Sequence, residues 1–173
     1  MSLETDLENW DMKSADAIAG IYGRYAKDPA FPGQIVAFMG KVPLQRGTTW
    51  LLKHHLEKSG DGVDDNLAEA IYEHAKQLEH WESKLHILQC MSRLPIPNTR
   101  VATVEAFLHK CLEDEAKFVR AWAYSGFREL AAQYPKFTMS VTQLLEHALK
   151  TETAGSIQAR LRRVIKQGFS QTV

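Results

Sequence analysis

Residues 84–94 read KLHILQCMSRL and residues 120–130 read RAWAYSGFREL, and both carry apolar or aromatic side chains at offsets +3, +4, +7 and +10. These positions are Ile87, Leu88, Met91 and Leu94 in the first stretch and Ala123, Tyr124, Phe127 and Leu130 in the second. The four offsets fall on one stripe of a helix with 3.6 residues per turn. Each stretch is therefore predicted to be an amphipathic helix that buries this stripe.

Two more basic residues continue the same register. Arg46 precedes Lys84 by 38 residues, Lys84 precedes Arg120 by 36, and Arg120 precedes Arg160 by 40. Such spacings are typical of helical solenoid repeats. The stripe of the last copy is mostly polar, as expected for a terminal repeat that has no successor to cover it. The sequence thus indicates about four copies of one helical unit.

Proline, glycine and capping residues divide the chain into helical segments with short connections. The helices are expected near residues 14–27, 32–38, 44–58, 65–78, 80–94, 99–112, 114–133, 140–150 and 154–168. The alternation typical of strands is absent, and short loops make successive helices antiparallel. We expect an all-α fold, an α-α superhelix of about four helical hairpins. It forms one domain over residues 1–173, with irregular N-terminal helices in 1–42 and repeats in 43–173.

Residues 114–124 (DEAKFVRAWAY) resemble the second helix of a HEAT-type repeat. That pattern has an aspartate in the turn between paired helices and a Val-Arg pair that ends six residues later, here Asp114 and Arg120. The resemblance implies a short right-handed solenoid of the HEAT-like or armadillo type. It also implies that Asp114 and Arg120 are structural and form a ladder between stacked repeats.

Composition excludes several classes of protein. Lys plus Arg and Asp plus Glu each number 21, so the chain is not built to hold an anionic surface all over. The longest apolar runs are too short to span a membrane, and the N-terminus lacks the pattern of a signal peptide. Two cysteines in apolar helical stretches, Cys90 and Cys111, are expected to be reduced. We expect a cytoplasmic protein without a membrane partner.

The chemistry-bearing residues do not form a recognisable catalytic or metal-binding motif. His74, His80 and His86 are six residues apart, which places them on different helix faces. The acidic segment from Asp61 to Asp65 lacks the ligand spacing of a calcium loop and is better explained as a loop with a helix cap. Glycine-rich phosphate loops are absent. We expect no catalytic residue, metal or cofactor, and an enzymatic role is not favoured.

The solvent-facing positions of the second helices suggest a binding surface. In the resembled family these helices line the concave side, and offsets +2, +5 and +9 would face solvent there. The candidate partner contacts are Leu51, His55, His86, Arg93, Trp122 and Arg162. Trp and Arg dominate the energetics of many interfaces. We therefore expect a non-catalytic scaffold or adaptor that binds a protein or peptide in its concave groove.

Two alternatives remain open at this stage. The basic C-terminal helix and Trp122 are also compatible with nucleic-acid binding, as in HEAT-like DNA glycosylases for alkylated bases. Arg162 and its neighbours could equally cap the array and complement the helix dipole. The other alternative is a small-molecule pocket between the N-terminal helices and the first repeat, near Trp50. The sequence leaves the partner and the oligomeric state open.

Overall fold

The computed structural model describes residues 1–170, and this part of the chain contains α-helices and short 3₁₀ helices but no strands. The α-helices are α1 (Leu3–Glu8), α2 (Ala15–Tyr25), α3 (Phe31–Phe38), α4 (Gln45–Ser59), α5 (Asp65–Ala75), α6 (Trp81–Cys90), α7 (Val101–Leu112), α8 (Lys117–Gln133), α9 (Thr138–Thr151) and α10 (Gly155–Gln167). The 3₁₀ helices are η1 (Val42–Leu44), η2 (Met91–Arg93), η3 (Asn98–Arg100) and η4 (Pro135–Phe137). The predicted all-α class is therefore confirmed. The last three residues of the predicted terminal repeat lie outside the described part.

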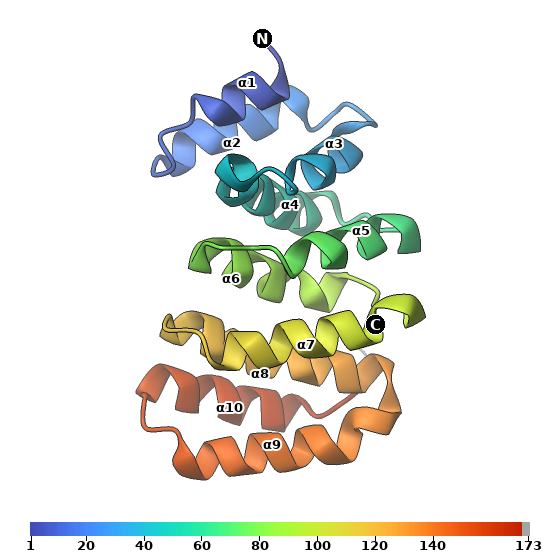
Figure 1. Cartoon of the computed structure of the whole chain (residues 1–173), viewed down its shortest axis with the longest axis vertical. Coiled ribbons are helices and arrows are strands. Elements are labelled where there is room, and N and C mark those ends of the chain that lie inside the picture. The colour runs from blue at the N-terminus through green and yellow to red at the C-terminus, as the bar shows by residue number, and fades with distance from the viewer. Residues whose placement is uncertain (171–173) are drawn as a thin grey trace.

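The helices are stacked in pairs along the long axis of the molecule (Figure 1). In one layer α4 packs against α6, α6 against α8, and α8 against α10. In the other layer α3 packs against α5 and α5 against α7. Within the pairs, α3 lies against α4, α7 against α8 and α9 against α10. Each helix of the first layer is thus held from two or three sides.

Capping residues fix several helix ends where the sequence predicts them. The Ser14 hydroxyl accepts a hydrogen bond from the Ala17 amide at 3.1 Å, and α2 begins at the next residue. Asp64 caps α5 in the same way. Gly60 ends α4 with φ of 65°, a left-handed conformation that glycine adopts without strain. These caps supply partners for helix-end groups that the helix itself cannot pair.

The apolar stripe that defines the repeat is buried in the two central copies. All eight of its residues in α6–η2 and α8 belong to the core, including the side chain that follows η2, Leu94. In the last copy Val164 is buried whereas Arg163 and Gln167 are exposed, as the polar pattern predicts. The periodicity therefore identified the packed face of these helices correctly.

Gly126 lets α8 approach its neighbours closely. A Cβ atom at this position would lie 2.4 Å from Cδ2 of Leu108 on α7 and 3.0 Å from Sδ of Met91. Both contacted side chains are fully buried and have little room to move. The absence of a side chain here sets the distance between α8, α7 and the end of α6.

The predicted boundaries need several corrections: the helix expected over 80–94, for example, ends at Cys90 and is followed by η2. Helix α1 was not expected, because six residues are too few to show a helical period. Helix α8 begins at Lys117 and not at Asp114, because Asp114 lies in the turn, where its Oδ1 accepts the Ala116 amide at 2.9 Å. The other Asp114 carboxylate oxygen is engaged by Lys84 at 2.7 Å. Its place in the turn matches the pattern that suggested the HEAT resemblance.

Candidate partner-binding cleft

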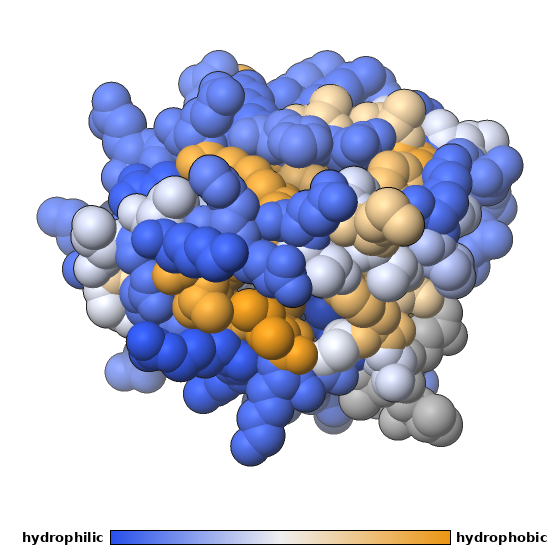
Figure 2. All heavy atoms as spheres, turned by 90° about the horizontal axis from the view of Figure 1, so that it is seen from below, coloured by the Kyte–Doolittle hydropathy of each residue, from blue (hydrophilic) through white to orange (hydrophobic). Residues whose placement is uncertain are grey.

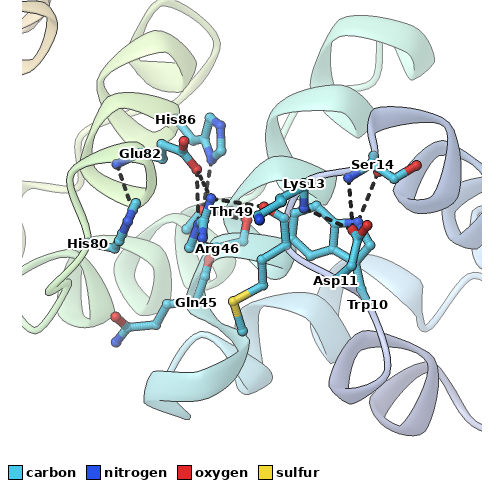
Figure 3. A network of polar contacts seen from close by, with 11 residues as sticks. Trp10, Asp11, Lys13, Ser14, Gln45, Arg46, Thr49, His80, Glu82 and His86 are labelled. Carbon is cyan, nitrogen blue, oxygen red and sulfur yellow. Dashed lines mark hydrogen bonds and ion pairs between the residues drawn. The ribbon is translucent and has the colours of Figure 1, made fainter.

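A cleft of about 440 Å³ lies where the turn between α1 and α2 faces α4 and α6 (Figure 3). It is lined by Trp10, Met12, Lys13, Ala15, Ile18, Arg46, Trp50, Glu82 and His86. The lining combines two indole rings and aliphatic side chains with cationic and anionic groups. The cleft therefore offers apolar contact area together with charged groups of both signs.

The turn that forms one wall is held by local hydrogen bonds. Trp10 Nε1 donates to the Ser14 carbonyl at 2.9 Å, which fixes the indole against the start of α2. Asp11 Oδ1 accepts the amides of Ser14 at 2.8 Å and of Lys13 at 2.9 Å. These two donors hold the pKa of Asp11 below its ordinary value. The turn is therefore a rigid wall and not a loose loop.

Met12 has φ of 58°, a left-handed conformation that is uncommon for a residue with a side chain. In this conformation its carbonyl accepts a hydrogen bond from Arg46 Nη2 at 3.0 Å. Such strain persists only where surrounding contacts maintain it, and it is often found at functional sites. At Met12 the hydrogen bond from Arg46 maintains the conformation and joins the α1–α2 turn to α4.

Arg46 is the central connection of the cleft. Its Nη2 lies 2.6 Å and its Nε 2.9 Å from Oε2 of Glu82, on α6. Both side chains are only a quarter to a third exposed. Together with the Met12 contact, this pair links the α1–α2 turn, α4 and α6. The floor of the cleft thus depends on contacts between three successive helical pairs.

His86 forms the far side of the cleft as a neutral ring. Burial, and next the positive charge of Lys53, lowers its pKa to about 4. Its Nδ1 lies 3.0 Å from the Thr49 hydroxyl, which itself donates to the Gln45 carbonyl at 2.7 Å. Since threonine has one hydroxyl proton, we assign the imidazole proton to Nδ1. Nε2 is then a hydrogen-bond acceptor at neutral pH.

Aromatic side chains continue from the cleft along α4. The Trp50 ring stacks on His54 with centroids 4.6 Å apart, and His54 meets the edge of Tyr22 at 4.7 Å. Tyr22 in turn contacts Phe31 and His55. Burial lowers the pKa values of His54 and His55. This row supports Trp50 from behind and fixes its orientation in the cleft.

The two residues assigned to a structural ladder behave differently. Asp114 pairs with Lys84, so it joins the turn before α8 to the preceding α6. Arg120 donates to the carbonyls of Asp114 at 2.7 Å and Glu115 at 2.9 Å, within its own helical pair. The connection between these pairs is therefore made by Lys84. Its register equivalent one unit earlier, Arg46, also pairs with the following unit, but through Glu82 on helix α6.

The structure disperses the predicted partner contacts. His86 lines the cleft, whereas His55 lies further along α4 with its Nδ1 3.3 Å from the Tyr22 hydroxyl. Arg93 and Arg162 are exposed away from the cleft lining. Leu51 is fully buried, so its prediction as a solvent-facing contact is wrong. Helix α4 has few open positions because α2, α3 and α6 all pack on it.

Trp122 is half-buried beneath a residue of the next pair. The guanidinium carbon of Arg160, on α10, lies 3.8 Å from the centroid of the indole ring. Burial lowers the pKa of Arg160. This cation–π contact occupies one face of Trp122, so that face is not open to a partner in this conformation.

The sequence analysis left open a pocket near Trp50, between the N-terminal helices and the first repeat, but it did not identify most of the residues that line this cleft. Trp10 and Lys13 lie in the segment that was expected to be irregular, and Arg46 served only to set the repeat register. One signal was present: Glu82 follows Arg46 by 36 residues, about one repeat length, which places the two on adjacent second helices. Pairs of this kind can be sought in the sequence as oppositely charged residues that are one repeat length apart.

Comparison with known proteins identifies no relative: no family model, curated protein or solved structure matches the chain.

Among residues 1–170, no helix is both long enough and apolar enough to cross a bilayer. In the same residues, no cluster of three or more His, Cys, Asp or Glu is placed to hold a metal ion. Cys90 and Cys111 are free thiols, and burial raises the pKa of each to about 12.

Proposed function

We propose that the chain is a non-catalytic binding module of the HEAT-like type, a scaffold or adaptor that takes a protein or peptide into the cleft between the α1–α2 turn, α4 and α6. The observation that carries the proposal is the pair of indole rings, Trp10 and Trp50, held beside Arg46 and Glu82 in a cleft of about 440 Å³. Tryptophan and arginine side chains held in this way are typical of interface hot spots. The proposed superhelical arrangement would provide the stiff frame.

The rigidity of the cleft supports binding with little ordering cost. Trp10 is fixed by its hydrogen bond to Ser14, Trp50 by its stacking on His54, and Arg46 by Glu82. Side chains that are already ordered lose less conformational entropy when a partner binds. The cleft is therefore suited to hold an apolar side chain of a partner against the indole rings while polar groups of the lining pair with its backbone.

The absence of a catalytic arrangement in the lining favours binding over chemistry. Arg46 and Glu82, which are charged groups of the lining, are paired with each other, and His86 is neutral at pH 7. The free thiols and their raised pKa values are compatible with the cytoplasmic location that we propose.

The test is cross-linked capture from the native cell with the tagged full chain and matched variants. Lys13→Glu and Trp50→Leu alter the cleft, and Lys27→Glu changes an exposed lysine outside the lining. We expect the proteins enriched by the wild type and by Lys27→Glu to be lost with both cleft variants, while far-UV circular dichroism stays unchanged. The same enrichment with all four chains would overturn the proposal.

The cleft also lies where the small-molecule alternative places a pocket, and its volume is in the range of ligand sites. A small molecule released on denaturation of the wild type, and missing from Trp50→Leu, would favour that alternative. Nucleic-acid binding is tested by a salt-dependent shift of duplex DNA that is abolished when Arg162 and Arg163 become Glu. Either result in place of protein capture would replace the proposed function.

A further inference from the structure

The first turn of α6 separates the cleft from a second hollow, of about 520 Å³. Glu82 and His86 line the cleft, whereas Lys84 lines the second hollow together with the α5–α6 and α7–α8 turns. Residues two apart on a helix point about 200° apart, so the two depressions lie on different sides of α6. Both lie at the edge of the stack that carries the α1–α2 and α7–α8 turns (Figure 1). They are therefore successive grooves between neighbouring units.

A mostly buried ion pair lies in the second hollow. Lys84 Nζ is 2.7 Å from Oδ2 of Asp114, and the two side chains are only 14% and 10% exposed. The other Asp114 carboxylate oxygen accepts the Ala116 amide. This carboxylate is therefore satisfied inside the molecule and is not free for a ligand.

Three further carboxylates of the lining are exposed, those of Glu79, Glu113 and Glu115. Within residues 1–170 none of these three carboxylates forms an ion pair or a side-chain hydrogen bond. Lys110 is exposed as well, and burial lowers the pKa of His80, so that this ring is neutral at pH 7. The lining thus carries four carboxylates and two ammonium groups, a net charge of −2. We call it the acidic hollow.

Trp81 adds an aromatic surface to the acidic hollow. It is the first residue of α6, its side chain is 38% exposed, and the His80 ring stacks beside it with centroids 6.0 Å apart. The face of an indole attracts a cation, and nearby carboxylates pair with the same charge. This chain already contains such a contact, because the Arg160 guanidinium lies 3.8 Å from the centroid of the Trp122 ring. The hollow therefore suits a basic side chain.

The end of the stack at α9 and α10 is less selective. Figure 2 shows apolar side chains gathered among hydrophilic ones on this end. The hollow there measures about 130 Å³, and Glu146 is the charged residue of its lining. Its charge pattern does not specify a partner, whereas that of the acidic hollow does.

We propose that the acidic hollow binds a lysine or arginine side chain of the same protein or peptide partner that places an apolar side chain in the cleft. This inference rests on the proposed function, because it extends the partner from the cleft across the first turn of α6. The unpaired carboxylates select the basic side chain, and Trp81 packs against it. Neither groove has to open or to release a segment of the chain before the partner binds.

The distance between the grooves defines the spacing of the two side chains in the partner. Helices packed side by side lie about 8–10 Å apart and an extended peptide advances about 3.3 Å per residue, so the step across α6 takes about three residues. The partner segment is therefore extended. It carries an apolar residue and, about three residues away, a lysine or an arginine.

The experiment selects binders from a phage-displayed library of random peptides on the immobilised full-length chain. The affinity of the enriched peptides is then measured by fluorescence anisotropy. We expect an apolar and a basic residue at the stated spacing, and binding that weakens at least about fivefold with each of Glu115→Lys, Trp81→Ala and Trp50→Leu. Glu146→Lys, which reverses the charge of an exposed glutamate on α9 outside both grooves, is the matched control and should leave binding unaltered. Circular dichroism verifies that each variant is helical.

The variants separate failure of this inference from failure of the proposed function. Peptides without a basic residue, or peptides weakened by Trp50→Leu but not by Glu115→Lys and Trp81→Ala, would overturn the role of the acidic hollow and leave the cleft standing. Peptides that depend on Trp81 and Glu115 but not on Trp50 would overturn the shared partner. If the wild type enriched no peptide over a chain with both tryptophans replaced, the two proposals would fail together.

Discussion

Arg46 and Glu82 form an ion pair that joins two helices separated by one repeat length, and the same guanidinium binds the carbonyl of the strained residue Met12. The pair therefore serves both the packing of successive helical pairs and the shape of the cleft. Because the two side chains are only partly exposed, their interaction is less screened by solvent than that of a surface pair.

A double-mutant cycle on this pair should reveal coupling. We expect Arg46→Ala, Glu82→Ala and the double variant to give a coupling energy of about 1 kcal/mol in the free energy of unfolding, measured by urea denaturation. The i, i+4 pair of Lys53 and Glu57, which lies within α4 and has the more exposed carboxylate, is the control and should give no more than about 0.5 kcal/mol. Equal coupling in both cycles would show that the Arg46 pair adds nothing beyond a surface contact.

Gly126→Ala should destabilise the protein by about 1–3 kcal/mol, because the new methyl group overlaps Leu108 in a packed region. Intrinsic helix propensity alone predicts the opposite, a gain of about 1 kcal/mol. Gly20→Ala, at an exposed position within α2, lacks the overlap and should stabilise by about 0.5–1 kcal/mol. Thermal or urea unfolding measures both, and stabilisation by Gly126→Ala would contradict the close packing of α8 on α7.

Phe127→Ala should cost about 3–5 kcal/mol, as expected for a buried aromatic side chain. Ser125→Ala, two residues earlier and on the side away from the core, should cost less than about 0.5 kcal/mol. Both are measured as changes in the free energy of unfolding in urea. The reverse order would invalidate the assignment of the faces of α8.

Stability should depend on pH through His86. The folded-state pKa of His86, about 4, lies below the ordinary value of about 6.5, so the unfolded chain binds a proton first as the pH falls. The free energy of unfolding is then greatest above pH 6.5 and falls as the pH drops towards 4, by up to about 1.4 kcal/mol per pH unit. Burial lowers the pKa values of His54, His55 and His80 too, so the wild type is compared with His86→Asn.

Urea unfolding at several pH values between 4 and 7 isolates the contribution of His86 as the difference between the two chains. His86→Asn should have a visibly shallower pH dependence. His147→Gln, which removes an exposed histidine of α9, is measured alongside as the control for losing a histidine. Identical slopes for the wild type and His86→Asn would show that the ring is not held neutral by burial.

Local patterns in the sequence predicted most of the secondary structure. Ser14 and Asp64 identified helix starts, because capping depends on residues only three positions apart. The stripe containing Ile87 and Phe127 identified the packed face, because burial follows the helical period. Such features depend on near neighbours along the chain, which is why one sequence suffices to find them.

The residues that line the cleft could not be predicted in the same way. Trp10, in the α1–α2 turn, and Trp50, on α4, line the same cleft because α2 packs on α4, and no local sequence pattern links them. Leu51 was misplaced because a fixed offset was assumed to face solvent in every copy, whereas packing on α4 differs from that on α8. The cover of Trp122 by Arg160 was missed for a similar reason, because this contact depends on how α10 packs on α8.

The cleft draws its walls from the first three helical pairs, whereas α8 is packed between α6, α7 and α10. In a stack held together mainly by contacts between adjacent units, opening begins at the ends. The Trp10 wall, at one end of the stack, should therefore open before the interior helix α8 does. A ligand in the cleft would contact the α1–α2 turn, α4 and α6 together and so stabilise that end of the molecule. Amide hydrogen exchange should therefore slow in α1 and α2 when the ligand binds, while the exchange of α8 stays unchanged.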